Sequence, residues 1–174
     1  MTIRERWINL FHRAASGTRR SRTLLTPVGV LAFVLFSALL VLAAVVVDEA
    51  LGLPGLLPEA ARWPVAVPVF AVGVLLVATA VMQFLRARGT PVPFNPPPQI
   101  IDAGLYRYAR NPMLSGVLLV LFGMGFGFNS MSLVLVFTPL YILVNVWELK
   151  NIEEPELERR LGEPYVEYRR KTPM

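Results

Sequence analysis

The side chains with the clearest chemical potential lie in the polar segment 104–116, where Arg110 and Asn111 directly precede Pro112. A proline fits the first turn of a helix, and the backbone N–H groups of that turn have no partner within the helix. A helix start with Arg110 and Asn111 beside it is a natural site for an anion or a carboxylate. An ordinary N-cap at Asn111, with Arg110 reaching to lipid phosphates, explains the same residues equally well.

A pair of carboxylates, Glu153 and Glu154, follows a long apolar stretch. Near a membrane surface, such a pair can bind a cationic group, for example an amine, or the hydroxyl groups of a ribose. On their own, however, such residues are more often solvated, and here they can pair with Lys150 and Arg159 on the same helix.

Composition excludes several other kinds of site. The chain has no cysteine and one histidine, His12, so disulfides and Cys-based metal sites are excluded and no metal site is predicted. The spacing of glycines 123, 125 and 127 is similar to that of a glycine-rich nucleotide-binding loop. They lie in an apolar run, however, without the preceding strand that such a loop requires. The net charge of +5 points to anionic lipid head groups and not to nucleic acid, because no arginine cluster is interleaved with aromatic residues.

Long apolar stretches must position these residues. A helix needs roughly 20 apolar residues to cross the ~30 Å hydrocarbon layer, and three uncharged stretches reach that length. The third is longer than one span requires and has turn residues at Asn129 and Ser130, which predicts a helical hairpin; a single tilted helix is the alternative. We therefore predict an all-α integral membrane protein of about four transmembrane helices, at residues 24–47, 65–85, 114–128 and 131–147.

The basic residues predict the orientation. Every Lys and Arg except Arg62 precedes the first span, lies between the second and third, or follows the last. An even number of spans puts these three regions on one side, so we expect both termini in the cytoplasm. The expected location is the inner membrane of a bacterium or an archaeon. Gly116 and Gly123 offer small faces that could pack within or between chains, so the oligomeric state stays open.

Three polar segments flank the spans. In residues 1–23, apolar side chains recur on one face and arginines on the other, which predicts an amphipathic helix at the membrane interface. Residues 86–113 contain five prolines between positions 91 and 98, a stiff stretch that is either a linker or one wall of a pocket. In residues 148–174, Pro155 is expected to open a helix after a kink, Gly162 to cap it, and a short helix with Tyr168 to follow.

Together these segments resemble the membrane-embedded methyltransferases typified by isoprenylcysteine carboxyl methyltransferase, with phospholipid N-methyltransferases as relatives. That family shows Gly-x-Tyr-x-x-x-Arg-His-Pro-x-Tyr, a helical hairpin, and then Glu-Glu-x-x-Leu-x-x-x-Phe-Gly-x-x-Tyr-x-x-Tyr. The residues that match are, in order, Gly104, Tyr106, Arg110, Pro112, Glu153, Glu154, Leu157, Gly162, Tyr165 and Tyr168. Asn111 stands in place of the histidine, Leu114 of the tyrosine and Leu161 of the phenylalanine, and the resemblance covers about residues 89–173, half of the chain.

The resemblance implies methyl transfer from S-adenosylmethionine to a lipophilic acceptor at the cytoplasmic face. The acceptor would be an isoprenylcysteine-like carboxylate or a lipid amine, and membrane lipids would be the partners. Arg110 or Glu154 would orient the acceptor as the catalytic residues. The implied cofactor-binding residues are Tyr106, Asn111, Pro112, Met113, Glu153, Tyr165 and Tyr168. Tyr106, Arg110, Asn111 and Pro112 would face the methionine end, and Glu153, Tyr165 and Tyr168 would contact the amino group, ribose or adenine.

Two functions of other classes stay open. The first is a membrane reductase that uses NADPH on a sterol-like or enone substrate, since reductases with a similar C-terminal arrangement exist. The second is a non-enzymatic membrane scaffold or lipid-binding protein, to which the changes at Asn111 and Leu114 point. Binding of S-adenosylhomocysteine would indicate the methyltransferase, binding of NADPH the reductase, and binding of neither the scaffold.

Overall fold

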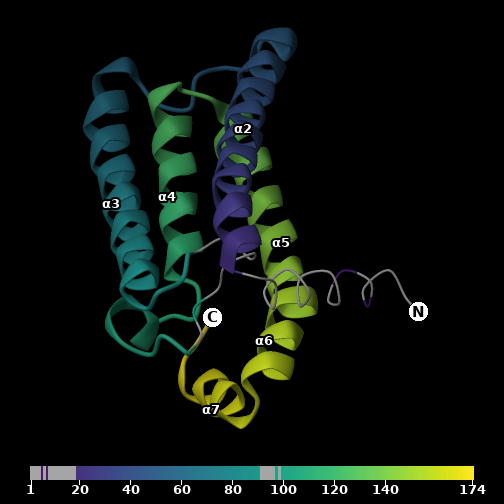
Figure 1. Ribbon diagram of the computed structural model, residues 1–174. Helices are drawn as coiled ribbons and strands as arrows, with labels where there is room; N and C mark the ends of the chain where they lie inside the picture. Colours follow the sequence, from purple (N-terminus) through teal and green to yellow (C-terminus); the bar gives the residue numbers. More distant parts are fainter. Residues whose placement is uncertain (1–4, 6, 8–18, 91–96, 98) are drawn as a thin grey trace. The chain divides into compact units, whose positions relative to one another are not determined.

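The computed structural model describes residues 5, 7, 19–90, 97 and 99–174, and every regular element within them is a helix (Figure 1). The elements are, in chain order, α2 (Arg19–Leu51), α3 (Glu59–Arg86), η1 (Gly104–Arg107), α4 (Pro112–Gly127), η2 (Leu133–Phe137), α5 (Thr138–Glu148), η3 (Leu149–Glu153), α6 (Glu154–Leu161) and α7 (Glu163–Lys171). η1 is a 3-10 turn, and η2 and η3 are π-helical. The predicted all-α class is confirmed.

Three helical stretches are long and apolar enough to cross a bilayer: Thr26–Leu51, Glu59–Arg86 and Leu133–Leu161. α4 is also apolar, but its 16 residues extend only about 24 Å, less than the ~30 Å hydrocarbon layer. Large apolar side chains remain exposed along the long helices, as expected of surfaces that lipid tails cover. The protein is an integral membrane protein with three long apolar helices and a fourth, shorter one.

Two helices extend beyond the predicted membrane spans at their N-terminal ends. α2 begins at Arg19, ahead of the predicted span that starts at residue 24, so residues 19–23 are helical turns that precede that span. α3 begins at Glu59 instead of residue 65 and carries Pro64 and Pro68 inside it. The predicted span, 65–85, is the uncharged apolar stretch and already contains Pro68, whereas α3 also includes Glu59, Arg62 and Pro64 before it. Membrane helices tolerate such prolines.

Other predictions fall on residues that the structure does not describe. The predicted interfacial helix lies outside the described residues except for Glu5, Trp7 and residues 19–23. The proline-rich segment lies outside them except for Pro97 and residues 86–90.

The chain divides into two compact units that alternate along the sequence. The first, which we call the site unit, contains Met1–Ala32, Thr79–Asn111 and Asn145–Met174. The second, the hairpin unit, contains Phe33–Ala78 and Pro112–Val144. The three basic regions belong to the site unit, and Arg62 belongs to the hairpin unit.

The hairpin unit contains the predicted turn between two apolar helices. Asn129 adopts a φ of +55°, and the backbone N–H of Ser130 donates to the carbonyl of Gly125 over 2.8 Å. A left-handed residue of this kind commonly ends a helix. The hairpin near Asn129 and Ser130 is therefore confirmed against the alternative of one tilted helix.

Close packing of α3 against α4 explains the glycines of the hairpin unit. A Cβ at Gly116 would lie 2.9 Å from the backbone nitrogen of Val77, and a Cβ at Gly123 would lie 2.7 Å from that of Phe70. Small residues permit such backbone approach in membrane helices. The small faces of Gly116 and Gly123 thus pack within the chain.

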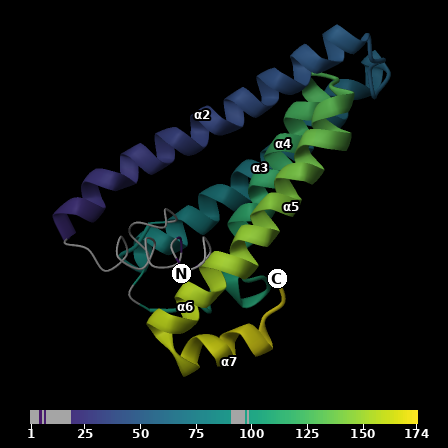
Figure 2. The same ribbon diagram turned by 90° about the vertical axis from the view of Figure 1, so that its right-hand side faces the viewer.

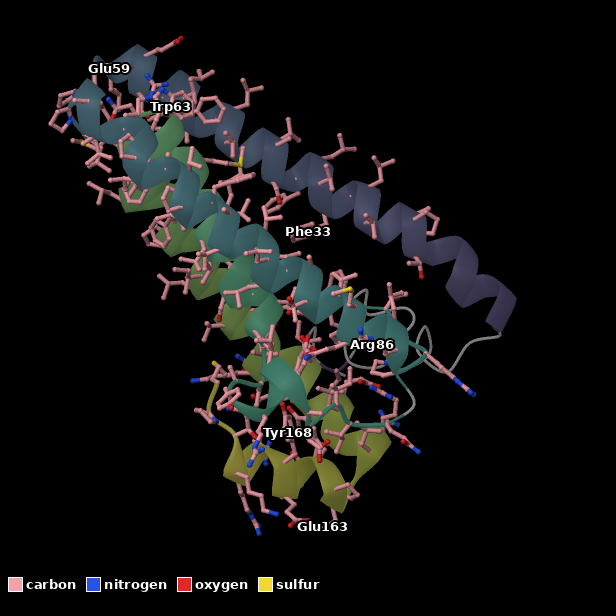
Figure 3. All side chains as sticks on the ribbon, turned by 90° about the vertical axis from the view of Figure 1, so that its left-hand side faces the viewer. Phe33, Glu59, Trp63, Arg86, Glu163 and Tyr168 are labelled. Carbon is pink, nitrogen blue, oxygen red and sulfur yellow. The ribbon has the colours of Figure 1, made fainter. Side chains whose placement is uncertain are left out.

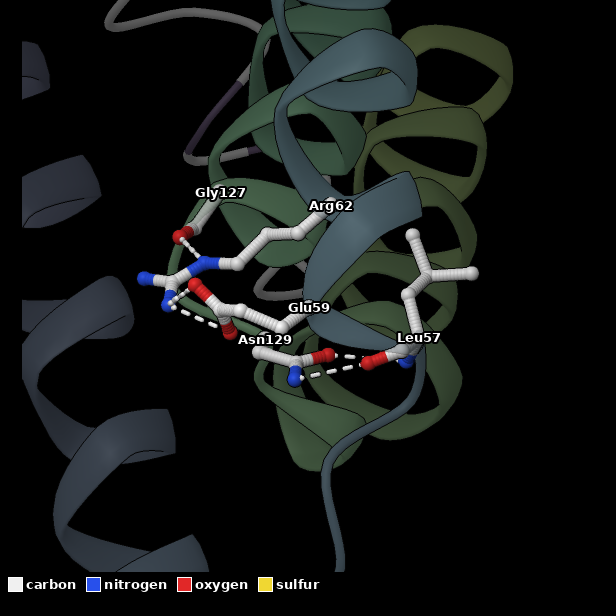
Figure 4. A network of polar contacts seen from close by, with 5 residues as sticks. All are labelled: Leu57, Glu59, Arg62, Gly127 and Asn129. Atoms are coloured by element: carbon white, nitrogen blue, oxygen red, sulfur yellow. Dashed lines mark hydrogen bonds and ion pairs between the residues drawn. The ribbon is translucent and has the colours of Figure 1, made fainter.

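A polar network ties the turn of the hairpin to the loop between α2 and α3 (Figure 4). The Asn129 side chain donates to the Leu57 carbonyl over 3.0 Å and accepts from the Leu57 N–H over 2.8 Å. The Nε–H of Arg62 donates to the Gly127 carbonyl at the end of α4, over 2.6 Å. A positive charge stabilises the C-terminus of a helix, so Arg62 has a structural role here.

Replacement of Asn129 by alanine is expected to lower the free energy of unfolding by about 2–3 kcal/mol, through two lost hydrogen bonds and left-handed backbone strain. Asn129→Gly loses the hydrogen bonds but keeps the φ, so it should fall between the wild type and the alanine variant. Chemical unfolding in detergent measures the free energy of unfolding of the three proteins and so tests this ranking. Equal stability of all three proteins would contradict it.

Candidate functional site

The segment that carries Arg110 begins with η1. Gly104 has a φ of +61°, a conformation that glycine adopts without strain. The side-chain amide of Gln83 occupies the place that a Cβ at Gly104 would need. η1 buries Tyr106, whose ring meets that of Phe84 edge-on, with centroids 5.5 Å apart. The glycine of the Gly-x-Tyr motif is therefore required by the backbone, whereas the overlap involves the end of the flexible Gln83 side chain.

Gly104→Ala is expected to cost about 1–3 kcal/mol of stability, chiefly through backbone strain, while the end of the Gln83 side chain moves away from the new Cβ. Gly52→Ala is the matched control, since Gly52 has a φ of +59° but nothing within 4 Å of its Cβ position. Adding Gln83→Ala to Gly104→Ala should remove the overlap and leave only the strain. If thermal unfolding shows that Gly104→Ala lowers stability equally in the wild-type and in the Gln83→Ala background, the overlap contributes nothing.

Arg110 and Glu154 form an ion pair within the site unit, and their side chains are 15% and 11% exposed. The Tyr165 hydroxyl lies beside the same guanidinium group. The Nε–H of Arg110 is buried and has no acceptor among the described residues. A pair so far removed from water is stable only when its geometry is good, so Glu154 fixes the position of the Arg110 guanidinium.

The π-helical segment η3 brings the two carboxylates to the site. The backbone N–H of Glu154 donates to the carbonyl of Leu149, five residues earlier, which is the π-helical bond. Pro155 stands in the first turn of α6, where its missing N–H costs little. The predicted break before Pro155 is thus a π turn, and α6 begins at Glu154.

One cavity of about 100 Å³ gathers six of the predicted site residues. They are Tyr106, Arg110, Glu153, Glu154, Tyr165 and Tyr168. Glu153 is exposed, whereas Glu154 and Tyr165 are buried. A glutamate from an exposed position therefore lines the same cavity as a buried ion pair.

A groove of about 710 Å³ adjoins the cavity, because both have Gln99, Ile100, Leu161 and Tyr168 in their walls. The rest of the groove is lined mainly by charged and polar side chains of both signs: Asp102, Arg107, Pro164, Glu167, Lys171 and Thr172. Cavity and groove thus lie next to each other within the site unit.

Hydrogen bonds join the two sides of this site. The Tyr168 hydroxyl donates to the carbonyl of Tyr106 over 2.7 Å, and the N–H of Arg110 donates to the carbonyl of Pro173 over 2.9 Å. Arg160 donates to the carbonyl of Pro97 over 3.1 Å. α7 turns back from α6 at Gly162 (Figure 2). Tyr168 lies on the side of α7 that faces η1, and Glu163 on the other side (Figure 3).

The tyrosines of the site stay neutral at physiological pH. Burial raises the pKa of the Tyr168 phenol to about 12. Burial also raises the pKa values of Tyr106 and Tyr165, and the nearby carboxylates Glu153 and Glu154, respectively, raise them further. These hydroxyls therefore keep their protons and act as hydrogen-bond donors.

Three other predicted residues are not in the walls of the cavity. Asn111 follows Arg110 in the site unit and is half-buried. Pro112 and Met113 open α4 and belong to the hairpin unit. Conversely, sequence reasoning missed Gln83 and Arg160. Gln83 was visible as a polar residue within an apolar span, whereas nothing in the sequence marks Arg160.

A comparison with protein families agrees with this site. The sequence model of a family described as phospholipid methyltransferase matches residues 62–164, more than half of the chain. The matched region contains Tyr106, Arg110, Glu153 and Glu154 and ends just before Tyr165. No curated protein and no solved structure shows significant similarity. The chain belongs to the phospholipid methyltransferase family and is a membrane methyltransferase.

Proposed function

We propose that the enzyme transfers a methyl group from S-adenosylmethionine to a lipophilic acceptor at the cytoplasmic face of the membrane. The observation that supports this best is the cavity that Glu153 lines together with the buried Arg110–Glu154 pair. The amino-acid part of the cofactor carries an ammonium and a carboxylate group, and the cavity offers a carboxylate and a guanidinium as their counterparts.

The residues present fit this cofactor in charge and in size. The buried Nε–H of Arg110 has no acceptor in the part of the chain that the structure describes, and a ligand carboxylate would supply one. The cavity of about 100 Å³ is below the roughly 300–1,000 Å³ typical of small-molecule sites, whereas the groove of about 710 Å³ falls within that range. We therefore assign the amino-acid part to the cavity and the nucleoside part to the groove.

The protein's own residues align the reacting groups and exclude water. When bound, S-adenosylmethionine supplies an electrophilic methyl group on a sulfonium for an in-line displacement, which depends mainly on alignment and on exclusion of water. Arg110, held by Glu154, orients the reacting groups. The resemblance assigns Asn111 and Pro112 to the methionine end and Met113 to the cofactor site. The acceptor arrives from the lipid and the cofactor from the cytoplasm.

The stability of the methylated product in base distinguishes the two classes of acceptor. A lipid amine gives an N-methyl product that is stable in base, whereas an isoprenylcysteine-like carboxylate gives a methyl ester that base hydrolyses. Labelled S-adenosylmethionine, offered with each lipid class and followed by base treatment, separates the two. A label that appears in neither lipid class would contradict a lipophilic acceptor.

Calorimetric titration of the detergent-solubilised protein with S-adenosylhomocysteine tests the cofactor. Saturable binding is expected, and Glu153→Ala should weaken it about 10- to 100-fold, as loss of a charged hydrogen bond does. Asn111→Ala should weaken it as well. Glu163→Gln is the control, because Glu163 is exposed and lines neither the cavity nor the groove.

Two outcomes would overturn the proposal. Binding of NADPH without binding of S-adenosylhomocysteine by folded wild-type protein would favour the reductase. Binding of neither, together with no effect of changes at Arg110 or Glu153 on any turnover, would favour the scaffold.

A further inference from the structure

The hydroxyl of Tyr168 is already engaged within the protein. It donates its proton to the backbone carbonyl of Tyr106, over 2.7 Å, and Tyr106 lies in η1, three residues before Ala109 and four before Arg110. A phenol has one proton to donate. The Tyr168 hydroxyl therefore cannot donate to a ligand without releasing η1.

A second hydrogen bond holds the same segment from the same direction. The backbone N–H of Arg110 donates to the carbonyl of Pro173, two residues past the end of α7, over 2.9 Å. Residues 106–110 are thus attached to α7 and the residues after it at both ends. Glu154 then sets where the side chain of Arg110 points.

The ion pairs of α7 have a different role. Arg169 pairs with Glu158 of α6 over 2.9 Å, and Lys171 pairs with Glu167 within α7. These ion pairs are largely exposed, so each contributes little. Neither of them reaches residues 104–110. Tyr165 of α7 approaches this segment at the Arg110 guanidinium, whereas the Tyr168 hydroxyl holds its backbone.

We propose that Tyr168 is a positioning residue, which holds the backbone of residues 106–110 so that Arg110 meets the carboxylate end of the cofactor. This inference rests on the proposed function. It assigns to the Tyr168 hydroxyl a role in fixing the protein and not in binding the nucleoside. The ring of Tyr168 remains a wall shared by cavity and groove.

Tyr168→Phe, titrated with two ligands, tests the assignment. S-adenosylhomocysteine carries the amino-acid carboxylate, and 5′-methylthioadenosine has the same nucleoside without it. Loss of one hydrogen bond that preorganises Arg110 should weaken S-adenosylhomocysteine about 5-fold. Binding of 5′-methylthioadenosine should stay within about twofold of the wild type, because the ring is kept. Tyr108→Phe is the matched control, since Tyr108 ends the same turn but is 74% exposed.

Two results would overturn the inference. An equal loss of affinity for both ligands would indicate that the Tyr168 hydroxyl contacts the nucleoside. Unchanged affinity for both would indicate that this hydroxyl has no role in binding. Amide hydrogen exchange across residues 105–110 gives a readout that needs no ligand, and it should be faster in Tyr168→Phe than in Tyr108→Phe. If wild-type protein binds neither ligand, the proposed function fails, and unchanged exchange would then reject the attachment itself.

Discussion

Glu154→Ala is expected to lower the free energy of unfolding by about 3–5 kcal/mol and to abolish methyl transfer. The Glu154 and Arg110 side chains are only 11% and 15% exposed. Removal of one partner leaves a charge that is buried and unpaired, which costs far more than the pair itself contributes. Chemical unfolding in detergent measures the first effect, and transfer of labelled methyl to lipid extract measures the second.

Two further variants make this expectation specific. Glu158→Ala breaks the ion pair between Glu158 and Arg169, whose two side chains are 45% and 35% exposed, respectively. Loss of this exposed pair should cost at most about 1 kcal/mol. The double variant Arg110→Met with Glu154→Leu removes both charges and should recover much of the stability, but none of the activity. If Glu154→Ala proved as stable as Glu158→Ala, the Arg110–Glu154 pair would have no structural role.

Gly123→Ala is expected to destabilise the hairpin unit by about 1–3 kcal/mol, although alanine is the better helix former. The new Cβ would lie 2.6 Å from the Cβ of Phe70 and 2.7 Å from its Cα and backbone nitrogen. Two of these atoms belong to the main chain of α3, so no change of rotamer relieves the overlap. The gain in helix propensity, at most about 1 kcal/mol, is smaller than the cost of moving two helices apart.

The control for this variant lies four residues further along the same helix. A Cβ at Gly127 would meet nothing closer than 3.7 Å. Gly127→Ala should therefore be neutral or slightly stabilising by the propensity argument alone. Thermal unfolding in the same detergent compares the two. A loss of similar size at both positions would mean that the glycines of α4 matter for flexibility and not for packing against α3.

The sequence by itself determined the elements whose causes are local. Apolar length predicts the membrane helices because the hydrocarbon layer sets how many residues must avoid water. The turn at Asn129 and the end of α6 at Gly162 follow from residues that adopt left-handed or unusual backbone angles readily, and the structure has φ values of +55° and +67° there. The motifs of the site were likewise legible as patterns, from Tyr106 and Arg110 to the Glu153–Glu154 pair.

Only the tertiary structure decided which of these residues meet. Arg110 pairs with Glu154, 44 positions later, and Tyr168 reaches Tyr106 across 62 positions. No periodicity encodes such pairs, because they depend on how distant segments pack. The π turn before Pro155, where the sequence predicted a kink, was likewise decided by the tertiary structure. A carboxylate that the sequence allowed to be solvated thus proved to be the partner that holds Arg110.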